Sequence, residues 1–205
     1  MAERCSGHLW WGIGAGTIMV VAAMYLGQES LTGQRLKSFG RVPAFTLLER
    51  SGEPFGTADL KGRVWIANFF FTSCSGICPI MTRHLSQLQT ALLQAGLSKV
   101  KLVSFSVDPE VDTPAVLARF AQKYGAQPGT WYFLTGRPDV MQELASRGFL
   151  LAAAGVNPPE PILHSDRFVL VDAAGRIRKS YIGTDASCVP QIVRDVRNLI
   201  AEVSW

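Results

Sequence analysis

The stretch RVWIANFFFTSCSGICPIM, residues 63–81, contains the three features that decide the fold of this chain. Its first nine residues form a nearly continuous apolar run, which is typical of a β-strand covered on both faces. Cys74 and Cys78 follow directly. Pro79 suits the first turn of a helix, where its missing N–H costs nothing, and leucines at helical spacing continue to Leu93. The stretch therefore predicts a buried strand, a cysteine-bearing loop and a helix.

The residues around this stretch predict an alternation of strands and helices. We expect strands at residues 45–49, 63–71, 99–107, 131–134, 167–172 and 176–182, and helices at 79–93, 114–124, 137–149 and 189–203. A turn is expected at residues 51–54, which end in Pro54. Asp112 and Thr113 are expected to cap the second helix, and Thr135 the third. The order indicates an α/β fold, and the strand–cysteine–helix junction with a late hairpin is thioredoxin-like: a central mixed sheet flanked by helices. The cysteines would lie at the carboxyl end of a central strand, where such sheets place chemistry.

The N-terminal part contains an apolar segment, Leu9 to Gly27, without a charged side chain. A transmembrane helix needs about 20 apolar residues, whereas the apolar run of a cleaved signal has about 7–15 and ends at a small-residue cleavage site. We therefore expect an uncleaved transmembrane helix rather than a removed signal. The predicted organisation is a cytoplasmic head at 1–8, an anchor at 9–27, a linker at 28–42 and a folded domain at 43–205.

The short head also bears on location. Eight residues leave no room for an Arg- and Ser-rich mitochondrial presequence, so we expect a bacterial inner-membrane protein whose soluble domain faces the periplasm. The charges flanking the apolar segment do not fix this orientation by themselves. The net charge of +4 is modest and the basic residues are scattered, which argues against nucleic-acid binding. Four cysteines, at positions 5, 74, 78 and 188, are too few for a disulfide scaffold.

The cysteine pair has three readings: a stabilising disulfide, a redox pair or a metal site. A helix N-terminus favours the thiolate, which is both a nucleophile and a soft-metal ligand. A disulfide that closes so short a loop stabilises little. Thioredoxin-like oxidoreductases carry C-x-x-C, but here three residues separate Cys74 from Cys78, and Gly76 lets the wider loop bend. Redox chemistry and metal binding both remain open on this evidence.

A third ligand would distinguish these two readings, and the chain has three histidines. His8 belongs to the head, and His84 lies six residues beyond Cys78, which turns it away toward solvent. His164 precedes the expected strand at 167–172, and in a thioredoxin-like sheet the loop before that strand lies against the cysteine loop. A lone histidine is more often structural, but two sulfurs and one imidazole suit copper, especially Cu(I). We therefore favour a site formed by Cys74, Cys78 and His164.

At this point the chain resembles the SCO/SenC family of copper chaperones, through the ordered stretches FFFTSCSGICPIMT, SVDPEVDTP and LHSDRFVLVD. The resemblance covers residues 42–203 and includes the anchor. It implies a membrane-tethered, thioredoxin-like metallochaperone that is not an enzyme and that helps to assemble the CuA centre in subunit II of cytochrome c oxidase. Cys74, Cys78 and His164 would bind Cu(I) or Cu(II). The implied partners are that subunit, a copper donor protein and a thiol reductant.

Two other functions use the same residues. Cys74 and Cys78 could cycle as a redox-active disulfide in a thiol–disulfide oxidoreductase that acts on extracytoplasmic cysteine pairs. A thiol peroxidase fits less well, because Thr72 and Cys74 lack the Thr-x-x-Cys spacing. Two further features have structural interpretations. The acidic SVDPEVDTP stretch reads as a turn and a helix cap, and Cys188 as a packed residue at the start of the last helix.

Overall fold

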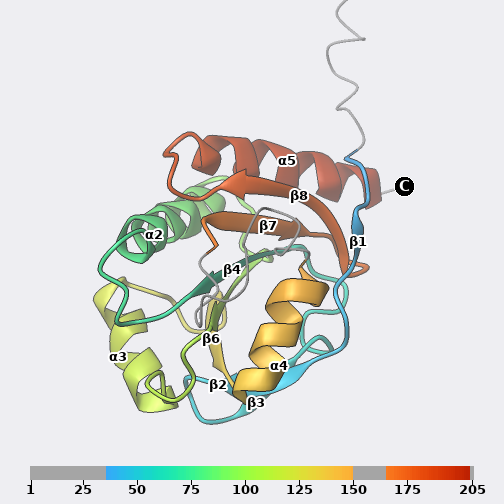
Figure 1. Ribbon diagram of the computed structural model, residues 1–205. Coiled ribbons are helices and arrows are strands. Elements are labelled where there is room, and N and C mark those ends of the chain that lie inside the picture. The colour runs from blue at the N-terminus through green and yellow to red at the C-terminus, as the bar shows by residue number, and fades with distance from the viewer. Residues whose placement is uncertain (1–35, 150–164, 204–205) are drawn as a thin grey trace, which may run out of the picture. The chain divides into compact units, whose positions relative to one another are not determined.

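The fold is built on one mixed β-sheet, shown in Figure 1 for a computed structural model that describes residues 36–149 and 165–203. Within these two ranges no helix is both long and apolar enough to cross a bilayer. The predicted head, the predicted anchor and residues 28–35 of the predicted linker lie outside the described residues, and so does His164. The α/β architecture expected from the sequence, a central mixed sheet flanked by helices, is confirmed.

The strands of the described part are arranged in the order β1-β8-β7-β4-β5-β6-β2-β3. β4 runs parallel to β5, β5 runs parallel to β6, and β7 and β8 are antiparallel neighbours on the other side of β4. The strands are β1 (Gly40–Arg41), β2 (Thr46–Glu49), β3 (Pro54–Gly56), β4 (Trp65–Phe70), β5 (Lys101–Ser106), β6 (Trp131–Thr135), β7 (Arg167–Val171) and β8 (Arg176–Ile182). The helices are α2 (Cys78–Gln94), α3 (Pro114–Lys123), α4 (Pro138–Glu143), the π-helix η1 (Leu144–Gly148) and α5 (Cys188–Val203).

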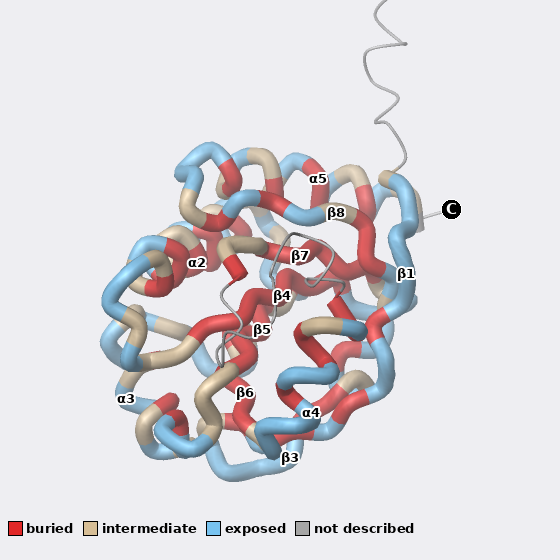
Figure 2. The backbone as a smooth tube through the Cα atoms, in the orientation of Figure 1, coloured by how far each residue is buried: buried red, intermediate tan, exposed pale blue. Residues whose placement is uncertain are grey.

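Strand β4 is buried along its whole length, as its apolar sequence predicts, and Figure 2 shows it among the red central strands. Its side chains alternate between two hydrophobic cores. Ile66 and Phe70 belong to the core under α2 and α5, whereas Trp65 and Phe69 belong to the core under α4. A strand held from both faces is a rigid support for the loop that follows it.

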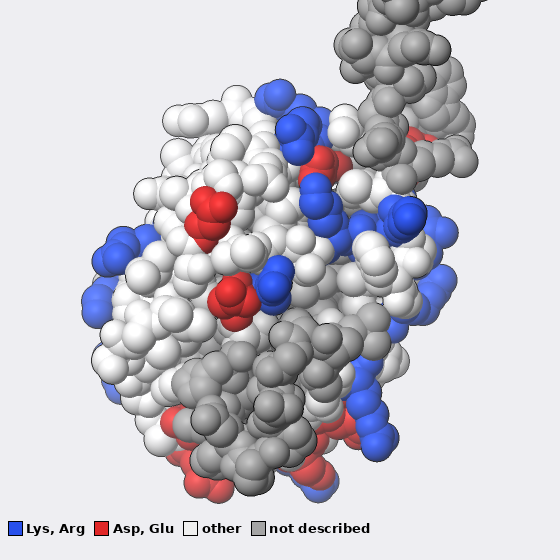
Figure 3. All heavy atoms as spheres, turned by 45° about the horizontal axis from the view of Figure 1, so that its top comes forward, with Lys and Arg blue, Asp and Glu red and all other residues white. Residues whose placement is uncertain are grey.

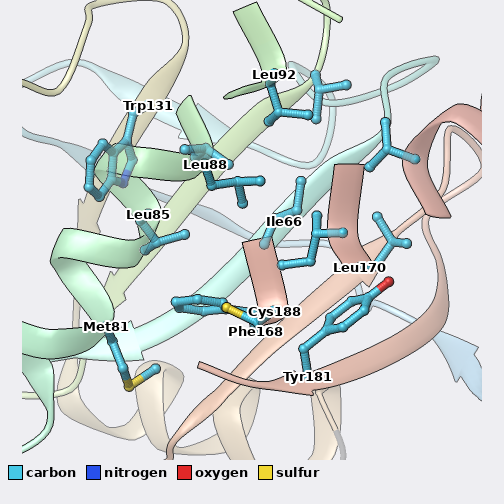
Figure 4. Packing of buried hydrophobic residues seen from close by; sticks show 14 of the residues in the cluster. Ile66, Met81, Leu85, Leu88, Leu92, Trp131, Phe168, Leu170, Tyr181 and Cys188 are labelled. Carbon is cyan, nitrogen blue, oxygen red and sulfur yellow. The ribbon is translucent and has the colours of Figure 1, made fainter. Parts of the chain in front are cut away.

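The first core forms where α2 and α5 cover one face of the sheet (Figure 4). Leu85 and Leu88 of α2 are at most 1% exposed and belong to the same cluster as Ile66 of β4 and Leu170 of β7. Leu85, Leu88 and Leu92 recur at helical spacing, which is the pattern that predicted this helix. Packing against the sheet therefore fixes the direction of α2 and the position of its first residue, Cys78.

The second core is largely aromatic and lies under α4 and η1. The ring of Phe69 stacks on that of Phe105 with centroids 5.1 Å apart, and Phe149 meets Phe69 edge-on at 5.2 Å. Phe45, which precedes β2, meets Phe105 edge-on at 5.3 Å. These contacts seal the second face of β4 and β5 with offset and edge-to-face pairs, the arrangements that aromatic rings prefer.

The structure corrects four local predictions. Residues 40–41, inside the predicted linker, form β1 and pair with β8. Pro54, placed in a turn, starts β3, which lies at the sheet edge where the missing N–H of proline is tolerated. The predicted cap at Thr135 is wrong: Arg137 is the N-cap of α4 without a side-chain bond, and the buried Oγ1 of Thr135 has no hydrogen-bond partner. The helix predicted at 137–149 is also split, because η1 continues α4 as a π-helix.

Candidate metal centre

The candidate centre lies in the loop of residues 71–77, hereafter the cysteine loop, between the carboxyl end of β4 and the start of α2. Cys74 is half-buried in this loop, and Cys78, the first residue of α2, is 5% exposed. Both thiols are free. The structure thus confirms the predicted placement of the pair at a helix N-terminus beyond a central strand.

The start of α2 lacks the usual capping groups. The N-cap residue, Ile77, offers no side-chain hydrogen bond, and the first turn contains no acidic residue. The sulfur of Cys74 instead accepts hydrogen bonds from the backbone N–H groups of Cys78, Gly76 and Ile77 and from the Cys78 thiol. Cys74 therefore fills the position of an N-cap side chain, and the helix end offers its N–H groups to sulfur.

The two thiols differ in acidity for this reason. Burial of Cys74 opposes its ionisation, but the hydrogen bonds from Cys78 and from the backbone outweigh burial, so the pKa of Cys74 lies below its usual value. Burial of Cys78, together with its hydrogen bond to Cys74, raises the pKa of Cys78 to about 12. The more exposed sulfur is thus the one that ionises first, and the buried sulfur keeps its proton.

A buried carboxylate holds the cysteine loop against β5. Asp112 is fully buried, and its carboxylate accepts hydrogen bonds from the backbone N–H of Thr72 at 3.0 Å, from the Thr72 hydroxyl, and from the Ser106 hydroxyl at 2.6 Å. Its negative charge also contributes to the raised pKa of Cys78. The sequence assigned Asp112 to a helix cap together with Thr113, but only Thr113 caps α3, by accepting from the N–H of Val116.

Of the three histidines, only His84 lies within the described residues. His84, expected to face solvent, is half-buried on α2, and its Nδ1 lies 2.8 Å from the carbonyl oxygen of Gly183, so that expectation is wrong. His164 lies outside the described residues. The next residue, Ser165, is 7% exposed and stands just before β7, which is antiparallel to β4 and therefore begins at the edge where β4 ends. Position 165 and the cysteine loop thus share one edge of the sheet.

Cys188 takes no part in this site. It is 2% exposed at the first turn of α5, in the same core as Phe168 and Tyr181 (Figure 4), which confirms the predicted packing role. Burial and the charge of Asp185 raise the pKa of Cys188 to about 11. Among the described residues, no group of three or more His, Cys, Asp or Glu side chains could hold a metal ion.

Known proteins resemble this chain in sequence and in fold. A family model described as SCO1/SenC matches residues 34–201. A SCO1/SenC family lipoprotein from Bacillus anthracis has a TM-score of 0.73 at 34% identity, over 80% of this chain and 98% of that one. BsSco, a member of the Sco family of cytochrome c oxidase assembly proteins with a disulfide switch, has a TM-score of 0.70 at 36% identity, over 81% of this chain and 98% of that one. Copper-bound ScoI of Arabidopsis thaliana has a TM-score of 0.63 at 25% identity, over 76% of this chain and 98% of that one.

Proposed function

The chain belongs to the SCO1/SenC family, and from this premise we propose that it is a metallochaperone that carries copper to the CuA site of cytochrome c oxidase subunit II or prepares the thiols of that site. The observation that carries the proposal is the pair of free, hydrogen-bonded thiols of Cys74 and Cys78 at the start of α2. The similarity to BsSco, an oxidase assembly protein, and to copper-bound ScoI supports the same reading.

The donor set suits copper as the cargo. Two sulfur ligands favour the soft Cu(I) ion, and the proposed third ligand is His164, next to Ser165 at the edge of the sheet where the cysteine loop lies. Three ligands leave the ion open to a further one, so an acceptor thiol or imidazole can bind before the donor ligands leave. Copper then passes between proteins without being released as a free ion.

Copper stoichiometry and affinity of the reduced protein test this proposal. We expect one copper ion per chain, with binding lost or strongly weakened in Cys74→Ser, Cys78→Ser and His164→Ala. Cys188→Ser and His84→Ala are matched controls, and both should bind one copper ion as tightly as the parent protein does. Unchanged affinity in His164→Ala would remove that residue from the site, and unchanged affinity in either cysteine variant would overturn the proposal.

A second function, thiol–disulfide exchange, is favoured by the acidity of Cys74. The Cys74 thiolate would attack a partner disulfide, form a mixed disulfide and release one partner thiolate. After Cys78 loses its proton, its thiolate would attack the Cys74 sulfur and release the second thiolate, so that two electrons pass from this chain to its partner. The resulting Cys74–Cys78 disulfide cannot bind copper until a thiol reductant restores the pair. Rapid reduction of model disulfides by the copper-free protein would favour this function.

We further propose that the chain is fixed to the bacterial inner membrane by residues 9–27, with its folded domain in the periplasm. A copper donor and a thiol reductant would then act from the same compartment. The similar protein of Bacillus anthracis is a lipoprotein. Extraction of membranes at alkaline pH separates integral from peripheral attachment. The full chain should stay in the membrane fraction, and a chain lacking residues 9–27 should be released.

A further inference from the structure

Basic side chains gather at the edge of the sheet opposite the cysteine loop. Lys61 and Arg63 precede β4, and Lys99 precedes β5. Because β4 and β5 are parallel, residues before them share the edge where both strands begin. Arg41 of β1 reaches the same edge, since it pairs with Arg176, the first residue of β8. We call Arg41, Lys61, Arg63 and Lys99 the basic pole.

The four side chains surround two adjoining hollows in the surface. Arg41 and Lys61 line a cavity of about 580 Å³, and Lys61, Arg63 and Lys99 line a second of about 440 Å³. Ala173, in the turn between β7 and β8, lines both. Figure 3 shows Lys and Arg side chains gathered along the right-hand side of the molecule, the side on which Figure 1 places this turn. The basic pole is therefore one continuous surface.

No acidic side chain in the described part of the chain forms an ion pair with the basic pole. Within residues 36–149 and 165–203, every ion pair closer than 4.0 Å joins other side chains. Arg176, which faces Arg41, is held by Asp172 at 2.8 Å. The carboxylate of Asp59 accepts from the N–H of Gly56 at 2.8 Å. Burial, and then the charge of Arg63, lower the pKa of Lys101, as expected beside unneutralised cations.

Exposed apolar side chains accompany these cations. Phe39, two residues before Arg41, is 59% exposed, and Ile200 of α5, which lines the second hollow, is 36% exposed. Cations mixed with exposed apolar groups are typical of surfaces that lie on lipid, where the cations meet headgroups and the apolar groups enter the boundary with the acyl chains. A soluble anion would use only the charges.

The length of the linker keeps this surface within reach of the predicted anchor. Arg178 donates from Nη2 to the carbonyl oxygen of Leu36 at 2.6 Å, which holds the first described residue beside the end of α5. Nine residue steps separate position 36 from the apolar segment ending at Gly27, which span at most about 30 Å when fully extended. We propose that the basic pole docks on anionic lipid headgroups of the membrane that anchors the chain, an inference that rests on the membrane attachment proposed above.

Docking of this kind would also orient the cysteine pair. The edge with the cysteine loop carries acidic residues, Asp108, Glu110, Asp166 and Asp185, and the Arg167 there is paired with Asp166 at 3.1 Å. An anionic surface attracts one edge of the sheet and repels the other. Strand β4 alone separates the two edges by about 20 Å. The docked domain therefore holds Cys74 and Cys78 away from the lipid, facing an acceptor protein.

Covalent labelling of lysine tests this docking in the full chain. The chain is reconstituted into nanodiscs of phosphatidylcholine alone, or of phosphatidylcholine mixed with phosphatidylglycerol, and labelled with an amine-reactive ester. Lys61 and Lys99 report on the basic pole, and the exposed Lys123 of α3 is the internal reference. In the anionic discs we expect Lys61 and Lys99 to label at least about fivefold more slowly than in neutral discs, the effect of one cation held at an anionic surface. High salt should remove the difference.

A matched pair of variants keeps the reporter lysines in place. Arg41→Glu/Arg63→Glu should abolish the protection in anionic discs, whereas Arg83→Glu/Arg119→Glu, which reverses two exposed arginines of α2 and α3, should retain it. Equal labelling in both lipids, or protection that survives Arg41→Glu/Arg63→Glu, would overturn the proposal and leave the basic pole to an acidic protein surface. A chain that associates with neither kind of disc would overturn it as well, through its premise. Copper plays no part in the readout, so failure here is distinct from failure of the chaperone proposal.

Discussion

At the scale of single residues, one helix N-terminus gives its two thiols different pKa values. Backbone N–H groups at the start of α2 stabilise the ionised form of Cys74. The buried thiol of Cys78 keeps its proton and donates a hydrogen bond to the sulfur of Cys74. Because Cys74 ionises before Cys78, the first ionisation of the pair places one negative charge on the more exposed sulfur, which limits the electrostatic cost of holding two sulfurs together.

This difference predicts a pH dependence for copper binding. Because the pKa of Cys78 is raised to about 12, binding at neutral pH must displace its proton. Affinity for Cu(I) should therefore weaken by about tenfold for each unit of falling pH, per proton displaced. Competition with a chelator whose own pH dependence is known would measure this. Affinity that is independent of pH in the parent would contradict the assignment.

Asp112 is the second residue whose role can be tested. In Asp112→Asn, the side chain can no longer accept all three hydrogen bonds from Thr72 and Ser106, and the free energy of unfolding should fall by about 1–3 kcal/mol. Loss of the negative charge should also make the Cys78 thiol more acidic, visible as alkylation at lower pH. Asp108→Asn is the matched control, because within residues 36–149 and 165–203 no hydrogen bond reaches that carboxylate, and its stability should change by less than about 0.5 kcal/mol. Equal effects in both variants would count against a specific role for Asp112.

The sequence predicted the positions of Cys74 and Cys78, but it did not predict the long-range hydrogen bonds that hold the cysteine loop and α2 in place. The apolar run, Pro79 and the leucine spacing predict where Cys74 and Cys78 lie, because each is a local signal. The bonds from Thr72 to Asp112 join residues 40 positions apart, and no local pattern distinguishes a carboxylate that caps a helix from one that ties down a loop. His84 shows the same limit, since its partner, the carbonyl of Gly183, comes from the far end of the chain.

At the scale of elements, the long strands and helices were predicted within a few residues, and the short ones were missed. β1 and β3 have two and three residues, too few for a periodic pattern, and they exist because the sheet offers them partners. The change from α4 to the π-helix η1 was also missed. Its last residue, Gly148, packs against Pro43, from which an added Cβ atom would lie 3.1 Å. These elements depend on tertiary contacts that propensity does not encode.

Arg178 of β8 connects the turn after β7, the end of α5 and the segment before β1, and it supports a prediction at this scale. It is 7% exposed, and it bonds Asp172 at 2.9 Å, Glu202 at 3.1 Å and the carbonyl of Leu36. Arg178→Met should lower the free energy of unfolding by about 3 kcal/mol, since it leaves buried acceptors unpaired. Arg176→Met removes the other, half-exposed partner of Asp172 and should cost less than about 1 kcal/mol. Urea denaturation of both variants decides this, and similar losses would show that Arg178 is not the central contact.

At the scale of the whole molecule, buried ionisable groups set the pH range in which the fold is stable. On the acid side, Asp172 and Asp195 resist ionisation through burial, but their hydrogen bonds to arginine, lysine and tyrosine side chains and to backbone N–H groups outweigh burial, so the pKa of each is lowered. A lowered carboxyl pKa contributes stability that is present above about pH 4, the value in the unfolded chain, and is lost as pH falls toward the folded value.

On the alkaline side the sign is reversed. Burial raises the pKa of Cys78 to about 12 and that of Cys188 to about 11, whereas thiols of the unfolded chain ionise near pH 8.5. Above that value the unfolded chain gains stability from ionised thiols that the folded chain keeps protonated.

The metal-free, reduced protein should therefore be most stable between about pH 5 and pH 8, with thermal unfolding midpoints that fall on both sides. Single variants separate the loss of stability at acid pH from the loss at alkaline pH. Asp195→Asn removes the carboxyl that holds Lys179 and Tyr181, and its midpoint should fall less steeply from pH 5 to pH 3 than that of the parent. Cys188→Ala should soften only the decline above pH 8.5. Variants that shift the midpoint equally at every pH would show that these groups act through packing rather than through their protons.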